Sequence, residues 1–371
     1  MSTKKIIILV IVIVGLAVTS YLLYYFYFQP MSTGEVEKEI TVEPKKIQMI
    51  FPLSQEKVLS PTINSSGDKV RYYSKANGNI FDVNFDGTGL VKISTSNLAG
   101  LLNILWSSDK EKVIGLFQKD DKIQKYLHNY QAGQSTLLNE NIGQVAWSPD
   151  GKQIVLQTYD ETAQTNTISI SDADGSNLKN IFQTRIKDMV LEWPTIDKIS
   201  IHTKTSGLSD GLAIVINPSN GEFYRVLGGI FGLNIKWSPL GNLLLYSSTS
   251  IEGKNPNLYV TDQTGQNKQA LGINSITEKC VFSQDNRALF CAVPQSVSEN
   301  AVWPDDYYKG LTVTADNFYK INLETGEKGL VFQPGENDKS YDAIDPFLSP
   351  KEDYLFFINR KDGMLYSLKI E

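Results

Sequence analysis

The chain has 371 residues, of which 20% are charged, 11% aromatic and 41% hydrophobic, so it can bury a substantial core. Its formal net charge is −6 and its isoelectric point is near 5.2. A nucleic-acid partner needs clustered Lys and Arg to displace counterions, and the sequence has no basic stripe, which argues against such a partner. Abundant Tyr, Phe, Val, Ile and Thr between short Gly and Asn/Asp turns favour an all-β fold.

Residues 1–28 are predicted to be a cytoplasmic tip and one transmembrane α-helix. The stretch Ile6–Phe28 has 23 uncharged residues, and a helix of that length spans about 35 Å, enough to cross a bilayer. Tyrosines gather at its far end, from Tyr21 to Tyr27, where rings suit the headgroup boundary. The alternative is a cleaved signal peptide, but its apolar region is usually about 7–15 residues long and ends in small residues. We therefore expect an uncleaved signal-anchor.

The charges on either side of this segment predict its orientation. Lys4 and Lys5 precede it, whereas the first fifteen residues after it carry Lys38 against four glutamates. The positive-inside rule then places the N-terminus in the cytoplasm and the large domain on the extracytoplasmic side, periplasmic or extracellular. Residues 29–46, with prolines and alternating Glu, are predicted to be a flexible stalk.

One short turn recurs along the rest of the chain. Its clearest copy is Trp147-Ser148-Pro149-Asp150-Gly151, in which Ser, Pro and Gly occupy their preferred type I turn positions. The next strand starts at Ile154, seven positions after the Trp. The same spacing, one residue shorter after Trp193, follows six other large apolar markers: Ile63, Trp106, Trp193, Trp237, Phe282 and Leu348.

Each unit also carries a second turn, in which an apolar strand leads into an Asp- or Asn-containing turn that closes on Gly. The clearest copies are Ile168–Gly175 and Leu258–Gly265. The markers of the first turn lie 41 to 46 residues apart, with 66 residues before the last one. Four short strands repeated at this period are typical of propeller blades.

These repeats predict an all-β, seven-bladed β-propeller of four-stranded blades over residues 47–371. The seventh unit supplies only three strands before the sequence ends, which would leave an open sheet edge. We expect the unassigned apolar stretch Ile47–Phe51 to form the fourth strand of that blade and to close the ring. Six or eight blades are the alternatives, because the first and fourth units are degenerate.

The alternation of Trp147–Lys152 with Ile168–Ser176 resembles the repeat of the TolB-like, or WD-repeat-like, β-propeller family. In that family a WSPDG turn alternates with a strand that ends in D-x-D-G. The similarity spans about residues 47–371 and is strongest in the third, fifth and sixth units. It implies a propeller fold. The same repeat occurs in propellers attached to prolyl-oligopeptidase-like hydrolases, so it implies no single activity.

No catalytic, cofactor-binding or metal site is predicted. Gly207–Gly211 matches the nucleophile elbow G-x-S-x-G, but that motif needs a strand-to-helix turn and a later His. His128 and His202 both precede it, so we interpret the match as a loop. Two His and two Cys are few for a zinc site, and Asp172–Gly175 lacks the later ligands of a calcium loop.

Cys280 and Cys291 flank the turn of the sixth unit. A turn centred between Asp285 and Asn286 would place the two cysteines directly opposite each other on paired strands, within reach of a disulfide. In an oxidising compartment we expect this bond to form, and two buried thiols are the alternative.

The sixth unit also holds one large insertion, Pro294–Asn317. Aromatic residues with polar groups beside acids are common in recognition surfaces, and loops often carry function. We therefore predict that the insertion helps to bind a protein or glycan partner. The alternative is that its rings pack onto the propeller and cover an edge. The candidate partner-binding residues are Trp303, Asp305, Asp306, Tyr307 and Tyr308.

The expected function is a non-catalytic protein-interaction module of the cell envelope, anchored in the membrane by residues 6–28, whose loop faces dock an envelope protein partner. The second hypothesis is a hydrolase or lyase with an acidic and tyrosine-containing axial pocket. Clustered carboxylates with raised pKa around the axis would support it, and an acid-free pocket would discard it. The third hypothesis is a structural envelope protein without a discrete ligand.

Overall fold

The structure is a computed structural model that describes residues 18–19, 21, 50–94, 97–335 and 339–370. Apart from residues 18–19 and 21, the predicted anchor and stalk lie outside the described residues, as do residues 47–49 at the start of the predicted closing strand. Within the described part of the chain, no helix is both long and apolar enough to span a bilayer. The chain divides into two units, 1–47 and 48–371, and the account below concerns the second.

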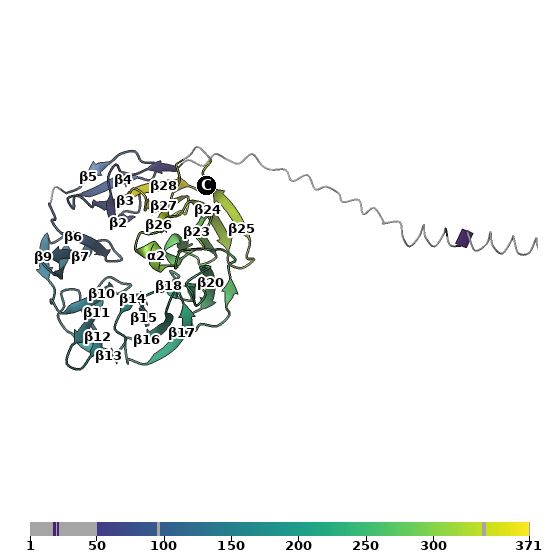
Figure 1. Ribbon diagram of the computed structural model, residues 1–371. Helices are drawn as coiled ribbons and strands as arrows, with labels where there is room; N and C mark the ends of the chain where they lie inside the picture. The colour runs from purple at the N-terminus through teal and green to yellow at the C-terminus, as the bar shows by residue number, and fades with distance from the viewer. Residues whose placement is uncertain (1–17, 20, 22–49, 95–96, 336–338, 371) are drawn as a thin grey trace, which may run out of the picture. The chain divides into compact units, whose positions relative to one another are not determined.

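Seven four-stranded antiparallel sheets surround a central axis, as Figure 1 shows, which confirms the predicted all-β, seven-bladed propeller. The first strand of each of the seven repeats is the innermost one. The first four blades comprise β2 (Val58–Ile63), β3 (Lys69–Ser74), β4 (Ile80–Asn84), β5 (Val91–Lys92); β6 (Leu101–Trp106), β7 (Lys112–Lys119), β8 (Lys122–Asn129), β9 (Gln134–Leu137); β10 (Ile142–Trp147), β11 (Gln153–Asp160), β12 (Thr165–Asp172), β13 (Lys179–Thr184); and β14 (Met189–Thr195), β15 (Lys198–Thr203), β16 (Asp210–Ile216), β17 (Phe223–Phe231).

The fifth and sixth blades are each continuous in sequence, whereas the seventh blade combines the first strand of the propeller with its last three strands. Two short helical turns, η1 and α2, accompany the sixth blade. The elements are β18 (Asn234–Trp237), β19 (Leu243–Ser248), β20 (Asn257–Asp262), β21 (Gln269–Ala270); η1 (Thr277–Lys279), β22 (Cys280–Phe282), β23 (Ala288–Pro294), α2 (Asp305–Tyr308), β24 (Asp316–Asn322), β25 (Lys328–Phe332); and β26 (Ala343–Leu348), β27 (Tyr354–Asn359), β28 (Met364–Lys369), β1 (Ile50–Pro52).

The last blade is closed by β1, from the start of the propeller. β1 pairs antiparallel with β28, so that Ile50 lies opposite Leu368. The backbone N–H of Leu53 continues the contact by donating to the Leu365 carbonyl at 2.8 Å. The predicted closure is confirmed: the described part of the strand is Ile50–Pro52, and residues 47–49 of the predicted stretch lie outside the described residues.

The recurring turn is held by its own side chains. Ser148 Oγ donates to Asp150 at 2.7 Å and accepts the backbone N–H of Gln153 at 2.9 Å. Gly151 N–H donates to the Ser148 carbonyl at 2.9 Å, and Gly151 has φ 67°, a left-handed conformation that favours glycine. These bonds satisfy the turn locally, so the sequence motif alone specifies it.

Two of the marker tryptophans link neighbouring blades. The indole N–H of Trp147 donates to the carbonyl of Leu105, on the innermost strand of the preceding blade, at 2.9 Å. Trp106 repeats this contact with the carbonyl of Ser60 at 2.8 Å. The apolar core lies mainly between the blades, where one sheet face packs against the next.

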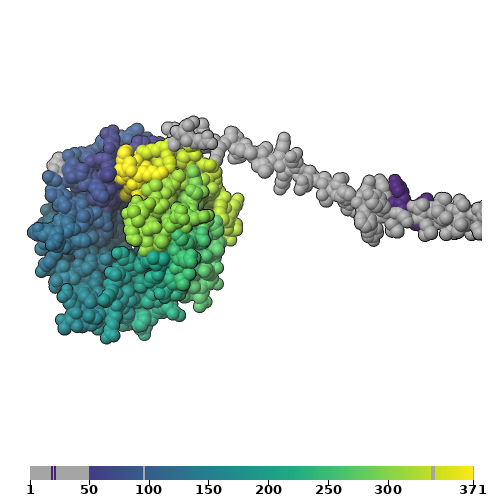
Figure 2. All heavy atoms as spheres, viewed as in Figure 1, coloured from purple at the N-terminus to yellow at the C-terminus, as the bar shows by residue number. Residues whose placement is uncertain are grey.

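The loops between the second and third strands of the blades lie on the face that carries α2, which we call the α2 face. The turns such as Ser148–Gly151 lie on the opposite face. Figure 2 shows the α2 face, hollowed near its centre beside the light green insertion of the sixth blade.

Candidate functional site

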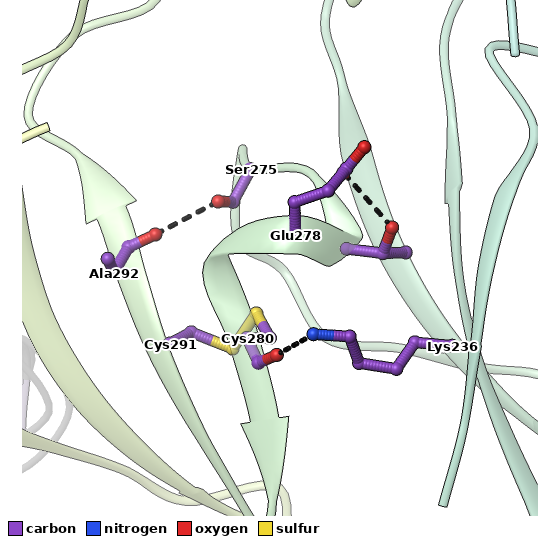
Figure 3. The surroundings of a disulfide bond; sticks show 7 residues. Lys236, Ser275, Glu278, Cys280, Cys291 and Ala292 are labelled. Carbon is purple, nitrogen blue, oxygen red and sulfur yellow. Dashed lines mark hydrogen bonds between the residues drawn. A yellow bond between two sulfur atoms is a disulfide. The ribbon is translucent and has the colours of Figure 1, made fainter. Parts of the chain in front are cut away.

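Cys280 on β22 and Cys291 on β23 lie directly opposite each other in the register that the turn spacing predicts. They form a disulfide with an S–S distance of 2.10 Å and a Cα–Cα distance of 4.1 Å (Figure 3). Both residues are fully buried. The amine of Lys236, on the neighbouring blade, donates to the Cys280 carbonyl at 2.7 Å, so the bridge adjoins the axial end of the sixth blade.

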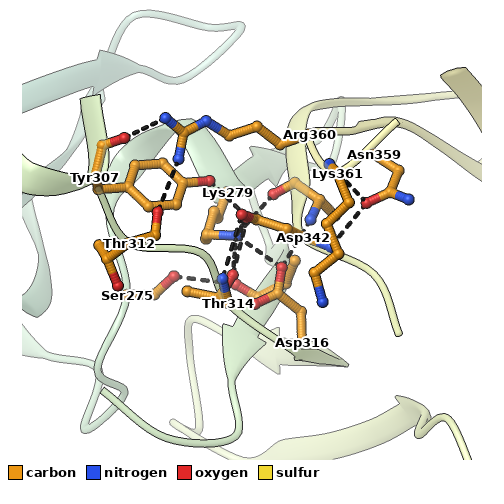
Figure 4. Close-up of polar contacts among 12 residues, drawn as sticks. Ser275, Lys279, Tyr307, Thr312, Thr314, Asp316, Asp342, Asn359, Arg360 and Lys361 are labelled. Atoms are coloured by element: carbon orange, nitrogen blue, oxygen red, sulfur yellow. Dashed lines mark hydrogen bonds and ion pairs between the residues drawn. The ribbon is translucent and has the colours of Figure 1, made fainter. Parts of the chain in front are cut away.

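A buried ion cluster lies beside the disulfide (Figure 4). Lys279 Nζ is 2.7 Å from carboxylate oxygens of both Asp316 and Asp342, and all three side chains are 0% exposed. It also lies 2.9 Å from Thr314 Oγ1 and 3.1 Å from the Ala343 carbonyl oxygen. The cluster therefore joins η1, the end of the insertion and the seventh blade.

The two carboxylates respond differently to this burial. Burial opposes ionisation of Asp342, but Lys279 and hydrogen bonds from Tyr307 and Thr314 outweigh it and lower the Asp342 pKa. Burial raises the pKa of Asp316, because its Oδ1 has no partner among the described residues and Lys279 compensates only in part.

Two of the predicted partner-binding aromatics face inward. Trp303 is 1% exposed and Tyr307 2% exposed, and their rings stack with centroids 5.4 Å apart. The Tyr307 hydroxyl donates to Asp342 at 2.7 Å, and the Arg360 guanidinium lies 4.0 Å from the centre of its ring (Figure 4 shows both partners). These two rings therefore pack onto the propeller, as the alternative interpretation of the insertion expected, and a partner could not contact them in this arrangement.

The two acids of the insertion bond to backbone and loop groups. Asp305 accepts the Gly207 N–H at 2.7 Å and the Ser206 hydroxyl at 2.9 Å, and Asp306 accepts the Val302 N–H at 2.8 Å. The match to G-x-S-x-G is thus a loop that docks on the insertion, entering β16 at Asp210.

Three loops of the α2 face are fixed to one another by these contacts. Trp303 N–H donates to the Gly253 carbonyl at 2.7 Å, and a Cβ on Gly207 would lie only 1.9 Å from the Trp303 carbonyl oxygen. Yet the same loops expose large apolar side chains, which we call the insertion patch: Leu208 (60% exposed), Ile251 (71%), Tyr308 (43%), Leu311 (73%) and Val313 (60%). Of the five predicted residues, only Tyr308 belongs to it.

A second polar group lies around the axis. The charges of Glu192, Glu278 and Asp345, which come from other blades or from η1, act on the Lys236 ammonium through space and favour its charged form. Groups from several blades are near enough for this only around the axis, so we call these four residues the axial cluster. A hollow of about 740 Å³ adjoins Glu192 and is also lined by Gln144.

A hydrogen-bond network connects the axial cluster to the insertion. Asn234 Nδ2 donates to Glu278 at 2.7 Å and lies 3.3 Å from the Tyr308 hydroxyl, which itself donates to Glu278. His202 Nε2 is 3.1 Å from Asn234 Oδ1, and burial lowers the His202 pKa to about 4. This histidine is therefore neutral at physiological pH.

Burial changes the ionisation of the axial cluster. It raises the Glu192 pKa to about 7, against the attraction of Lys236, and Glu192 Oε2 has no partner among the described residues. The side chain of Asp345 has exposed surface, yet desolvation by the surrounding protein raises its pKa, and the attraction of Lys236 offsets this only in part. Burial lowers the Lys236 pKa. The axial pocket is therefore not acid-free, and two of its carboxylates, Glu192 and Asp345, have the raised pKa that the enzymatic hypothesis requires.

Glu192→Gln should stabilise the protein above pH 7 and have no effect well below pH 4.5. Between its unfolded pKa of 4.5 and its folded pKa of about 7, Glu192 binds more protons in the folded state, so the native protein loses stability as the pH rises through this window. Above this pH window we expect the substitution to raise the free energy of unfolding by about 1–2 kcal/mol, less than the full pKa shift implies because water in the channel screens the charge. Denaturant unfolding across pH measures it; Glu140→Gln, at an exposed site, is the control. A pH-independent difference contradicts the assignment.

Comparisons with known proteins give the fold and no family. No family model and no curated protein matches the chain. Among solved structures, an oligogalacturonate lyase in complex with manganese is similar, with TM-score 0.63 and 12% identity over 87% of this chain and 93% of that one. The β-propeller domain of the Trilobed protease from Pyrococcus furiosus, described as having an open velcro topology, gives TM-score 0.56 and 11% identity over 85% and 96%. TolB from Acinetobacter baumannii gives 0.39 and 14% over 85% and 64%.

Identities this low show a shared propeller fold and transfer no activity. The propeller fold that the TolB-type resemblance implies is shared by the lyase and by the Trilobed protease domain. Within the ranges that the structure describes, no group of three or more His, Cys, Asp and Glu side chains is placed to hold a metal ion.

Sequence reasoning missed the axial cluster and the buried ion cluster. Lys279, Asp316 and Asp342 are far apart in sequence, and no short motif marks them. A weak signal was available, since Lys236 and Glu192 each stand next to a marker tryptophan on an innermost strand.

Proposed function

We propose that this chain is a non-catalytic protein-binding propeller, tethered to a membrane by residues 6–28, which docks an envelope protein on the extracytoplasmic side through the insertion patch. The observation that carries the proposal is the rigid exposure of five large apolar side chains on three mutually bonded loops. Exposed apolar surface on a preorganised frame favours binding, because little conformational entropy is lost on association.

The disulfide supports the extracytoplasmic side of this proposal. Disulfides persist in oxidising compartments and are rare in the cytosol. The uncharged stretch Ile6–Phe28 and the preceding lysines support a single-pass topology with a cytoplasmic N-terminus.

Site-specific photo-crosslinking in the native membrane tests the binding surface. With a photoreactive residue in place of Leu311 we expect one discrete protein adduct, and none with the same residue in place of Leu240, a 60% exposed side chain on the opposite face. Leu208→Ser with Ile251→Ser should reduce the Leu311 adduct by about tenfold while stability changes by less than about 0.5 kcal/mol. Equal adducts from both faces, or an unaffected adduct in the double variant, contradict the proposal.

The axial cluster favours a second candidate, a hydrolase or lyase that acts in the central channel. Glu192, with its pKa of about 7 and its unpartnered oxygen, could accept a proton at neutral pH, and the adjoining hollow of about 740 Å³ has room for a substrate. An acidic oligosaccharide is the substrate class to test first, given the lyase neighbour. Turnover of oligogalacturonate that is lost in Glu192→Gln and kept in Glu324→Gln, at an exposed turn away from the hollow, would favour this candidate over the binding module.

A further inference from the structure

A cavity of about 720 Å³ lies between the first and second blades, away from the axial cluster and the insertion patch. Its wall is formed by β3 and β4 of one blade, by β6, β7 and β8 of the next, and by residues that follow β5. Most of the lining is aliphatic or aromatic, with Ile104, Val113 and Phe117 at its base and Ile93, 48% exposed, at its rim. Volume and lining are those of small-molecule sites.

The cavity lies where one blade lacks a core side chain. The second strand of every blade presses two residues against the preceding blade, the first apolar residue after the turn and the residue two positions later. In the second blade these are Val113 and Gly115. A Cβ on Gly115 would lie only 2.6 Å from the Phe117 ring, so this ring covers Gly115 and takes part of the place that the missing side chain would fill. In the other six blades the second position carries a buried side chain: Tyr72, Leu156, Ile201, Tyr246, Cys291 and Phe357.

The charged groups at the cavity neutralise each other. The Arg71 guanidinium binds Asp82 through two bonds, Nε to Oδ1 at 2.7 Å and Nη2 to Oδ2 at 2.9 Å. A charged ligand would therefore find no uncompensated partner in this pair, and burial of its charge would be costly.

The cavity does offer hydrogen-bond donors. The hydroxyls of Tyr73 and Tyr130 bond to each other, which uses one of their two protons. Burial raises the pKa of Tyr130 to about 12, so both protons are present at neutral pH. Among the described residues no acceptor is found for the second proton. Among the same residues, the Nη1 group of Arg71 also has no hydrogen-bond acceptor within the cavity. An occupant that supplies an acceptor would satisfy these donors.

We propose that this interblade cavity binds an uncharged aromatic compound that carries a carbonyl acceptor. The rings of the ligand would pack against Phe117 and Val113, which line the cavity, and its carbonyl oxygen would accept the free proton of the Tyr73–Tyr130 pair. The site is independent of the axial cluster and of the insertion patch.

Photolabelling of the full-length chain with benzophenone tests the proposal, because this probe is an uncharged diaryl ketone that attaches to neighbouring C–H bonds under ultraviolet light. We expect labels on the cavity residues Leu98, Ile104 and Val113, mapped by mass spectrometry of peptides. Phenyl benzoate, which has a carbonyl, should compete at a concentration about fivefold to tenfold lower than diphenylmethane, which has none. Labels spread over the surface without enrichment in the cavity overturn the proposal.

Two variants block the cavity in different ways. Gly115→Leu pushes the Phe117 ring into the base of the cavity, and Ile93→Trp plugs the rim from a half-exposed position that leaves the core untouched. Each should reduce labelling of Ile104 by about tenfold. Gly329→Ala, on β25 with no atom closer than 3.9 Å to the added Cβ, is the matched control and should label like the natural protein. Undiminished labelling in Ile93→Trp overturns the site even if Gly115→Leu fails to fold.

The carbonyl assignment has its own readout. In Tyr73→Phe/Tyr130→Phe both hydroxyl donors are removed while the ring volumes are kept. We expect phenyl benzoate and diphenylmethane to compete equally in this variant, while apolar packing still permits labelling. A preference for phenyl benzoate that survives the double substitution contradicts the assigned contact.

Discussion

Lys279→Met should lower the free energy of unfolding by about 3–5 kcal/mol at neutral pH, because it leaves two buried carboxylates without their cation. Asp316 and Asp342 are both 0% exposed at the side chain, so water cannot replace the lysine without opening the fold. The loss should fall on the insertion as well, since Tyr307 and Thr314 bond to the same carboxylate. Denaturant unfolding followed by intrinsic fluorescence measures the change.

Lys122→Met is the matched control for this prediction. Lys122 pairs with Glu140 at 3.3 Å, but its side chain is 73% exposed, so its loss should change stability by less than about 1 kcal/mol. Adding Asp316→Asn and Asp342→Asn to Lys279→Met should recover part of the stability, because the uncompensated charges are then gone. A single Lys279→Met variant as stable as the natural protein would show that the cluster does not hold the insertion.

Removal of β1 should be the most disruptive change to the ring. A propeller that begins at residue 57 lacks β1 and the buried residues Leu53 and Ser54, and it exposes the edge of β28. We expect it to melt about 10 °C or more below the propeller of residues 48–371, or to aggregate through the free edge. Differential scanning calorimetry compares the two chains.

A peptide of residues 48–56 provides the control for that truncation. If β1 acts as a separable closing strand, the peptide should bind the shortened propeller and restore most of the lost melting temperature. A shortened propeller that melts with the longer one contradicts the role of β1, and a scrambled peptide that restores stability equally well contradicts its specificity.

The repeat could be recognised in the sequence because its turns are specified locally. Ser148, Asp150 and Gly151 satisfy one another within a few residues, so the motif carries its own structure. The blade count and the closing strand followed from the spacing and from the need to cover a sheet edge. The exact register, in which Ile50 lies opposite Leu368, could not be predicted because it depends on β28.

The sites could not be read in the same way, because they depend on residues that only the closed ring brings together. Glu192 and Asp345 are 153 positions apart in the sequence, yet both interact with Lys236. The insertion was assigned by composition, which does not distinguish a ring that faces a partner from one that covers a buried ion cluster. Trp303 and Tyr307 cover the buried ion cluster. Leu311 and Val313 are exposed, but single aliphatic residues in a loop give no sequence signal of a binding surface.

The insertion patch, the channel and the interblade cavity belong to a ring that is closed by the pairing of β1 with β28. A pair of cysteines tests this closure most directly. Phe51 lies opposite Ser367 in the pairing of β1 with β28. In Phe51→Cys/Ser367→Cys, mild oxidation followed by proteolysis should yield one disulfide-linked peptide that contains both positions, whereas Phe51→Cys/Ser200→Cys, with its second cysteine in the fourth blade, should yield none. Free thiols at 51 and 367 in the folded protein would contradict the closed ring.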